Sequence, residues 1–310
     1  MIQHIFIIGA PKTGTVSLFF YIFKHNKITN NIYPEINFNN KIKHNTQFFS
    51  CNYDDTLSYS DNYQNFLKFF IDNHFKKEQN INLNMLLDNS DNFYVCDSTP
   101  TYLLCGSYVI PKIYNSCPYI NSKFICILRN PIQRAFSHYL ICQKLCKPSN
   151  NSYKNISFID VINREIELIN YHNIHHEVEN YNKIIDKMNK CFCNCCNNIL
   201  MYGCYNIQLL QWIDTFNENL LILLTEDLEK NNIDNTMNNI FNFFNLPIFE
   251  DQNYFSNNYT LENEIYNDNI KFKNQITENE ISILKNFYKP YNDKLYQLIK
   301  RPEINQWNII

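Results

Sequence analysis

The chain has 310 residues, of which 45% are hydrophobic and 15% aromatic, enough to bury a large core without disulfide support. Its formal net charge of −3 excludes the overall positive field on which nucleic-acid binding usually depends, so any anion site must be local. Twelve cysteines in a chain of this length are too few for a disulfide scaffold and indicate reduced thiols.

The start of the sequence contains one short apolar run, residues 5–10, soon followed by Lys12. This run is shorter than the apolar stretch of a signal peptide or of a membrane-spanning helix. We therefore predict no membrane span and a cytoplasmic location, which agrees with reduced cysteines.

The predicted elements alternate between strands and helices. Residues 4–9 form a continuous apolar, β-branched run that is typical of a buried parallel strand, and residues 14–25 then carry apolar side chains at helical spacing. Three further strands are predicted at residues 93–96, 123–128 and 220–224. This alternation predicts an α/β fold with a central parallel sheet flanked by helices, in three layers, with ligands beyond the carboxyl ends of the strands.

The second half of the chain is predicted to be rich in helices. Apolar spacing indicates helices around residues 207–216 and 233–244, and Thr277 with Glu280 forms a capping box that opens a later helix. Residues 146–200 are polar and cysteine-rich with weaker periodicity, and we interpret them as a helical insertion or lid. The prediction is thus a single domain over residues 1–310.

The loop after the first strand, Gly-Ala-Pro-Lys-Thr-Gly-Thr over residues 9–15, has the features of a phosphate site. Free N–H groups and the helix dipole at a strand-to-helix turn favour a bound phosphate. A nucleoside-triphosphate loop has its lysine after the second glycine, but here Thr15 follows Gly14 and the lysine is Lys12. From this position an ammonium group can reach an oxygen that bridges two anionic groups. The alternative is a plain turn with an incidental lysine.

A second anion motif is predicted over residues 127–139, Ile-Leu-Arg-Asn-Pro-Ile-Gln-Arg-Ala-Phe-Ser-His-Tyr. Arg129 ends a predicted strand, Pro131 fits the first position of a helix, and Ser137 lies about two turns along it. A guanidinium fork with a hydroxyl suits a phosphate monoester better than a lone lysine does. The alternatives are an ion pair for Arg129 and a solvated position for Ser137. Arg134 stays open, because its spacing from Ser137 also permits a helix-surface salt bridge.

Together the two motifs resemble those of sulfotransferases that use 3′-phosphoadenosine 5′-phosphosulfate (PAPS), with the greatest similarity to the heparan-sulfate (glycan) type and its bacterial relatives. The resemblance extends over residues 97–102, 202–226 and 284–307. It implies a P-loop-like fold and two sets of donor-binding residues, namely Lys12, Thr13, Gly14, Thr15 and Val16 for the 5′-phosphosulfate, and Arg129 and Ser137 for the 3′-phosphate.

The resemblance also implies a reaction. The sulfuryl group of PAPS would pass to a hydroxyl or amine, preferably on a carbohydrate acceptor, without a metal, while Lys12 stabilises the leaving oxygen. Glu35, within residues 33–38, matches the catalytic base of the family, and a carboxylate near the sulfuryl group could accept the acceptor's proton. Without the resemblance, Glu35 is simply a carboxylate in a loop.

Two departures from the family pattern keep other functions open. Ser98 stands where many relatives have a lysine, and the basic loop near the carboxyl end has no clear counterpart, with Lys271 and Lys273 as positional candidates. These departures permit a donor-binding module without turnover. The other alternative, a P-loop nucleotide or small-molecule kinase, requires a lysine after the loop glycine and an acidic residue that binds magnesium.

The cysteines and histidines of the predicted insertion were also considered as metal ligands. The densest cluster comprises Cys191, Cys193, Cys195 and Cys196. It contains one C-x-x-C spacing of the kind that zinc sites use, but no second well-spaced pair accompanies it. We therefore prefer free thiols and predict no metal. His175 and His176 are interpreted as part of a polar helix end or lid.

Overall fold

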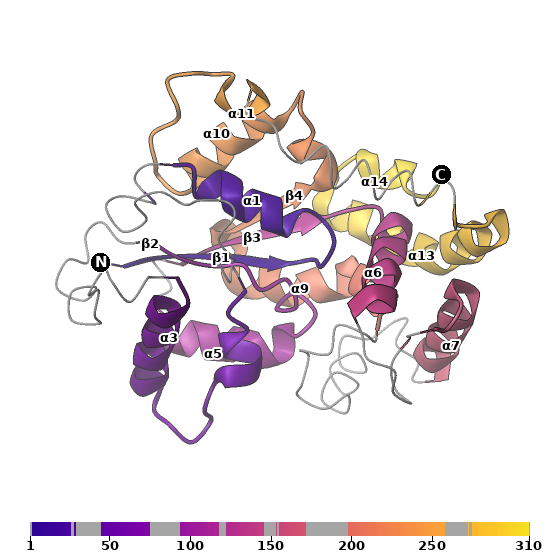
Figure 1. Ribbon diagram of the computed structural model, residues 1–310, viewed down its shortest axis with the longest axis horizontal. Helices are drawn as coiled ribbons and strands as arrows, with labels where there is room; N and C mark the ends of the chain where they lie inside the picture. Colours follow the sequence, from indigo (N-terminus) through magenta and orange to yellow (C-terminus); the bar gives the residue numbers. More distant parts are fainter. Residues whose placement is uncertain are drawn as a thin grey trace.

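The computed structural model describes residues 2–25, 28, 45–74, 94–117, 122–145, 153, 155–171, 198–257, 272 and 275–309 (Figure 1). Within these residues lies a four-stranded parallel sheet in the order β2-β1-β3-β4. Its strands are β1 (Gln3–Gly9), β2 (Tyr94–Asp97), β3 (Ser122–Leu128) and β4 (Leu220–Leu224). The predicted α/β fold with a central parallel sheet is confirmed, and each predicted strand lies within one residue of the observed one.

The strands are apolar along nearly their whole length because helices cover both faces of the sheet. On one face, α1 (Thr15–Ile22), α10 (Ile233–Phe243) and the short α11 (Tyr254–Asn257) bury one apolar cluster. On the other face lie α3 (Tyr59–His74), α5 (Gly106–Ser116) and α9 (Tyr205–Phe216), as Figure 1 shows.

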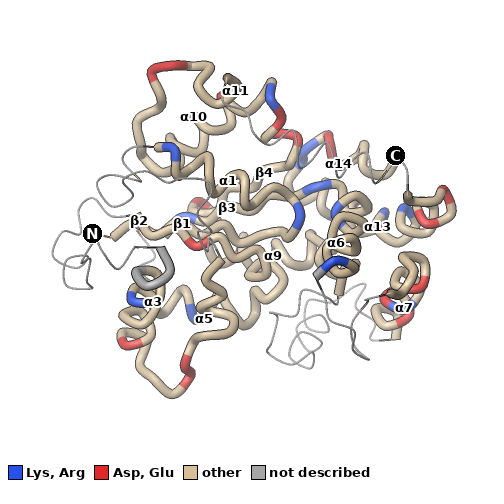
Figure 2. The backbone as a smooth tube through the Cα atoms, in the orientation of Figure 1, with Lys and Arg blue, Asp and Glu red and all other residues tan. Residues whose placement is uncertain are grey.

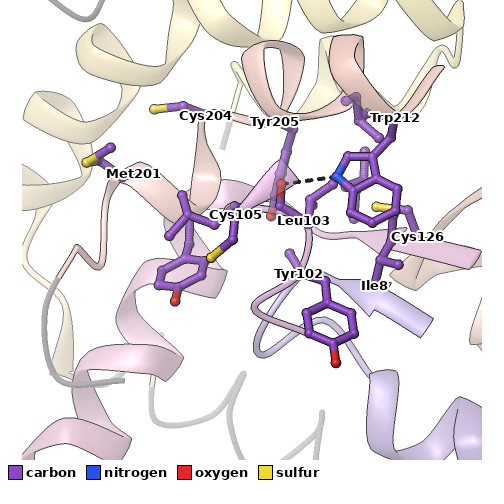
Figure 3. Close-up of a cluster of buried hydrophobic side chains, with 14 of the residues drawn as sticks. Ile8, Tyr102, Leu103, Cys105, Cys126, Met201, Cys204, Tyr205 and Trp212 are labelled. Carbon is purple, nitrogen blue, oxygen red and sulfur yellow. Dashed lines mark hydrogen bonds between the residues drawn. The ribbon is translucent and has the colours of Figure 1, made fainter. Parts of the chain in front are cut away.

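The second face carries the larger core, which lies under the carboxyl end of β1. Figure 3 shows Trp212 of α9 directed at the segment after β2, where its indole Nε1 donates to the carbonyl oxygen of Leu103 at 3.4 Å, with Ile8 and Cys126 nearby. The N–H of Leu103 in turn donates to the carbonyl oxygen of Ile8 at 2.7 Å. The core therefore fixes the backbone just before the predicted phosphate loop.

The remaining helices gather near the carboxyl ends of the strands. They are α6 (Pro131–Leu145), α7 (Phe158–Tyr171), α13 (Glu278–Ile299) and α14 (Glu303–Gln306), with short turns η5 (Met201–Gly203) and η7 (Thr225–Leu228). Two more turns lie elsewhere: η6 (Asn217–Asn219) leads into the amino end of β4, and η1 (Phe48–Asn52) contacts α5. Pro131 is the first residue of α6, as predicted. The predicted capping box is confirmed, because Thr277 and Glu280 satisfy each other's backbone N–H groups.

The predicted insertion at residues 146–200 is described only in part. It contains α7, whose buried face comprises Phe158, Val161, Ile162, Glu165 and Ile169. Its cysteine cluster, His175 and His176 lie outside the described residues, so the insertion and the single-domain organisation stay predictions.

The described part of the chain shows neither a membrane span nor a group of metal ligands. None of its helices combines the length and the apolar composition that crossing a bilayer requires. Its seven cysteines are free thiols, six of them buried, and it shows no group of three His, Cys, Asp or Glu side chains arranged to hold a metal.

Candidate functional site

The loop between β1 and α1 leaves the start of α1 open for an anion. Gly14 is the N-cap residue of α1 with φ 101°, a conformation that favours glycine, and no side chain caps the helix. The first N–H groups of a helix have no partner within the helix, so those of α1 remain as donors. The Thr13 hydroxyl donates to the carbonyl oxygen of Ala10 at 2.7 Å, so it serves the loop itself.

The loop also starts at a position with no room for a side chain. A Cβ added to Gly9 would lie 2.5 Å from the Cβ of Leu103 and 3.0 Å from the carbonyl oxygen of Pro100. Gly9 therefore lets the segment after β2 pack directly against the end of β1. Of the other predicted residues here, Thr15 is buried, whereas Lys12 and Val16 are half-buried.

Arg129 brings the second predicted motif against the first. It follows β3, is only 4% exposed, and its Nη1 donates to the carbonyl oxygen of Lys12 at 3.2 Å. Its own carbonyl oxygen accepts from the Tyr205 hydroxyl at 2.9 Å, and its Nε donates to Gln133 Oε1 at 3.4 Å. The loop and α6 thus orient this guanidinium, and α9 holds the backbone of Arg129. The two motifs, 117 positions apart, meet at one edge of the sheet.

Thr225 is a second link between the motifs, and the sequence analysis missed it. Its hydroxyl lies 2.9 Å from the carbonyl oxygen of Thr13 and 3.1 Å from that of Leu128. A hydroxyl has one proton, so it donates to one of these oxygens at a time. The sequence does contain a signal that points to Thr225: it directly follows the strand predicted at residues 220–224, at the edge where ligands bind in such sheets.

Arg134, which the sequence left open, is an interior residue. Its side chain is fully buried, which rules out the helix-surface salt bridge. Its guanidinium donates to the carbonyl oxygen of Ile199 and, at 3.5 Å, to that of Pro11, and its Nη1 lies 3.2 Å from His138 Nδ1. Arg134 therefore joins the phosphate loop to the backbone at the end of the predicted insertion.

The carboxylate of Glu165 on α7 holds the same backbone from the other side. It accepts from the N–H groups of Ile199 and Leu200 at 2.7 and 2.6 Å. Burial raises the pKa of Glu165, while the Leu200 N–H bond and the positive charge of Arg134 act in the opposite direction. Glu165 and Arg134 are thus two buried, opposite charges that hold the same stretch of backbone, at residues 199–200.

Ser137 lies on α6, one turn beyond Gln133 and two turns beyond Arg129. It is 3% exposed, so the solvated position considered from the sequence is wrong. Asn130, next to Arg129, caps α6 by accepting from the N–H of Ile132 at 2.9 Å. The strand end and the helix cap therefore set the position of both predicted 3′-phosphate residues.

The carboxyl end of β2 carries a buried polar group of its own. Asp97 accepts hydrogen bonds from the Thr46 hydroxyl at 2.7 Å, the Thr99 hydroxyl at 2.6 Å and the Tyr102 hydroxyl at 2.9 Å. Burial raises the pKa of Asp97, and these hydrogen bonds oppose the rise. Ser98, where relatives have lysine, is fully buried, and its hydroxyl has no hydrogen-bond partner among the described residues.

The acidic residues at this edge of the sheet are engaged in contacts within the protein. Asp227 accepts two hydrogen bonds from Arg301, at 2.7 and 3.1 Å, and Glu226 accepts one from the Trp307 indole at 3.0 Å. Asp97 is engaged too, whereas the second carboxylate oxygen of Glu226 is buried without a hydrogen-bond partner among the described residues. These residues include no group of three side chains that could hold magnesium, which a kinase requires. Figure 2 shows Lys and Arg segments in the β1–α1 loop and in α6, at the same end of the sheet.

Some predicted site residues fall outside the described part of the chain. These are the predicted base Glu35 and the positional candidates Lys271 and Lys273. Nothing in the structure tests their roles.

The fold and this loop define a P-loop-like α/β protein with an anion site at the carboxyl edge of a parallel sheet. The family model described as "Sulfotransferase domain" matches residues 3–289. The chain therefore belongs to the sulfotransferase domain family.

Two individual proteins illustrate the relationship. Human carbohydrate sulfotransferase 15 is 25% identical to this chain over 188 residues, which are 58% of the chain and 30% of that protein. The chain thus matches less than a third of that relative's length. A solved sulfotransferase structure from Alicyclobacillus acidocaldarius has a TM-score of 0.57 and 19% identity, covering 98% of this chain and 97% of its own. At that identity the likeness shows the fold alone.

Proposed function

We propose that the protein is a sulfotransferase that transfers the sulfuryl group of PAPS to a hydroxyl or amine of an acceptor. The observation that carries this proposal is the meeting of two anion motifs, through the 3.2 Å contact between Arg129 and the Lys12 carbonyl. A donor with phosphate groups at both the 5′ and the 3′ position needs two anion-binding sites that lie close together. The uncapped start of α1 supports the 5′ half of this assignment.

In this proposal the backbone N–H groups from Thr13 to Val16 bind the 5′-phosphate, and Arg129 with Ser137 binds the 3′-phosphate. The donor supplies an activated sulfuryl group whose bond to the bridging oxygen breaks as the bond to the acceptor forms. Lys12 stabilises the negative charge that develops on the bridging oxygen, and Glu35 accepts the proton of the acceptor. The protein positions charges and forms no covalent bond, so the mechanism requires no metal.

We assign the acceptor to the carbohydrates, because a relative over more than half of the chain is described as a carbohydrate sulfotransferase. Residues 1–310 would form one domain, with residues 146–200 as the insertion or lid that contacts the acceptor. The decisive experiment is calorimetry with adenosine 3′,5′-bisphosphate, followed by transfer of radiolabelled sulfate to a panel of glycans. Magnesium-dependent ATP hydrolysis without sulfate transfer would contradict the proposal, and tight nucleotide binding without transfer to any acceptor would favour the donor-binding module.

Arg129→Ala should weaken the binding of adenosine 3′,5′-bisphosphate by roughly a hundredfold, because charge-assisted hydrogen bonds to a phosphate are lost. The same substitution should change the affinity for adenosine 5′-monophosphate by less than about threefold, since that ligand lacks the 3′-phosphate. Calorimetry with both nucleotides measures the difference. Arg164→Ala, on the exposed face of α7, is the control. Equal losses for the two ligands would mean that Arg129 supports the loop and does not bind the 3′-phosphate.

Glu35→Gln should lower kcat by about a hundredfold or more while donor affinity stays unchanged, because the amide cannot accept the acceptor's proton. Sulfate transfer at saturating donor measures kcat, and its dependence on pH should lose the rising limb that the base produces. A Glu35→Gln protein with wild-type turnover would reject the assigned role.

A further inference from the structure

The first turns of α6 present two lines of side chains with different surroundings. Positions four apart lie on one line along a helix. The line of Asn130, Arg134 and His138 faces the interior, where Asn130 caps the helix and Arg134 contacts His138. The neighbouring line contains Gln133 and Ser137, and Arg129, which precedes the helix, joins the start of this line through its 3.4 Å hydrogen bond to Gln133. Gln133 therefore stands between the two residues assigned to the 3′-phosphate.

Gln133 differs from its neighbours in exposure. Every residue from Pro131 to His138 is buried except Gln133, which is half-buried. Its side chain therefore reaches the surface at the point where Arg129 and Ser137 are covered. An anion that approaches Arg129 along this line would meet the amide of Gln133.

The hydrogen bond to Arg129 fixes which way this amide faces. A guanidinium is a donor only, so the Gln133 atom 3.4 Å from Arg129 Nε has to be the oxygen. The Gln133 NH₂ group keeps two donors, and it has no hydrogen-bond partner among the described residues. The Lys12 carbonyl contacts the same guanidinium from the loop side, and both of these acceptors are neutral groups.

We propose that Gln133 is a specificity-determining residue for the 3′-phosphate. It orients Arg129 through its oxygen and offers its NH₂ group to the phosphate. This inference rests on the proposed function, since it assumes a donor with a 3′-phosphate. It assigns a role to a residue that the sequence analysis did not use.

The test compares three proteins with two nucleotides. Gln133→Glu keeps the size of the side chain but adds a charge that pairs with Arg129 and repels phosphate. Gln133→Leu removes the amide and adds no charge. We expect the affinity for adenosine 3′,5′-bisphosphate to fall about tenfold or more in Gln133→Glu and about threefold to tenfold in Gln133→Leu. The affinity for adenosine 5′-monophosphate should change less than about twofold in both.

Steady-state kinetics adds a readout that a purely structural role would not produce. The KM for PAPS should rise in Gln133→Glu while kcat at saturating PAPS stays near the wild-type value. Gln64→Glu on α3, an exposed glutamine on a different helix, is the matched control and should change neither value. Thermal unfolding of each variant shows whether the fold is retained.

The outcomes separate this inference from the proposed function. If wild-type protein prefers the bisphosphate but the Gln133 variants lose both nucleotides equally, or lose neither, the role of Gln133 is overturned and the donor assignment stands. If the wild-type protein binds the two nucleotides equally well, the donor assignment itself is overturned, and the inference about Gln133 with it.

Discussion

Lys12→Ala is expected to lower kcat for sulfate transfer by at least about a thousandfold, because it removes the one cation assigned to the leaving bridging oxygen. The loop should keep its conformation, since Arg129 contacts the Lys12 backbone carbonyl and not its side chain. Binding of adenosine 3′,5′-bisphosphate should therefore weaken much less than turnover. Radiolabelled sulfate transfer at saturating PAPS measures the first effect and calorimetry the second.

Two further proteins sharpen this experiment. Lys12→Arg keeps a positive charge and should restore part of the lost turnover, because the role needs a cation more than a particular geometry. Lys230→Ala, at an exposed lysine just after η7, is the matched control and should behave as wild type. Turnover of Lys12→Ala within tenfold of the wild-type value would contradict the assignment.

Arg134→Met should lower the free energy of unfolding by about 3 kcal/mol, because the fully buried guanidinium donates to two backbone carbonyl groups whose hydrogen bonds are lost together. The variant leaves Glu165 buried without the nearby positive charge that favours its ionised form. The carbonyl oxygens of Pro11 and Ile199 also lose their donor. Urea denaturation without nucleotide measures the change as a shift of the midpoint.

The control for this prediction lies next to Glu165 on the same helix. Arg164 is exposed and its guanidinium lies 5.8 Å from the centre of the Tyr153 ring, so Arg164→Met should cost less than about 1 kcal/mol. Adding Glu165→Gln to Arg134→Met should cost less than the sum of the two single changes, because the two side chains interact. An Arg134→Met protein within 1 kcal/mol of wild type, or strict additivity in the double variant, would show that the pair is not coupled.

The sheet could be predicted from the sequence because each strand is a continuous apolar run. Such a run is typical of a strand that is covered on both faces, whereas a strand with one exposed face alternates apolar and polar residues. The capping box at Thr277 could be predicted because both of its partners lie within four residues. The helix α7 was harder to recognise. Its apolar residues Phe158, Val161, Ile162 and Ile169 recur at helical spacing, but the polar, cysteine-rich composition of residues 146–200 as a whole conceals this short stretch.

In the candidate site, too, some residues could be predicted from the sequence and others could not. Lys12 and Gly14 could be found because the loop is contiguous and a left-handed glycine at a helix start has a sequence signal. Thr225 and Arg134 could not be assigned, because their roles depend on contacts with residues 212 and 65 positions away. Gln133 lies within the predicted second motif, but the orientation of its amide follows only from its hydrogen bond to the Arg129 guanidinium, which the sequence does not show.

The β1–α1 loop is restrained by residues far along the chain, since Arg129 contacts Lys12 and Thr225 contacts Thr13. The restraint continues to Asp227 in η7 and, through it, to Arg301 before α14. Opening the loop therefore means separating elements from across the whole domain. The Ala10 N–H, which donates to the carbonyl oxygen of Ile127 at 2.8 Å, should exchange with solvent only at free energies close to that of global unfolding. A ligand bound there would accordingly stabilise the domain as a whole and not the loop alone.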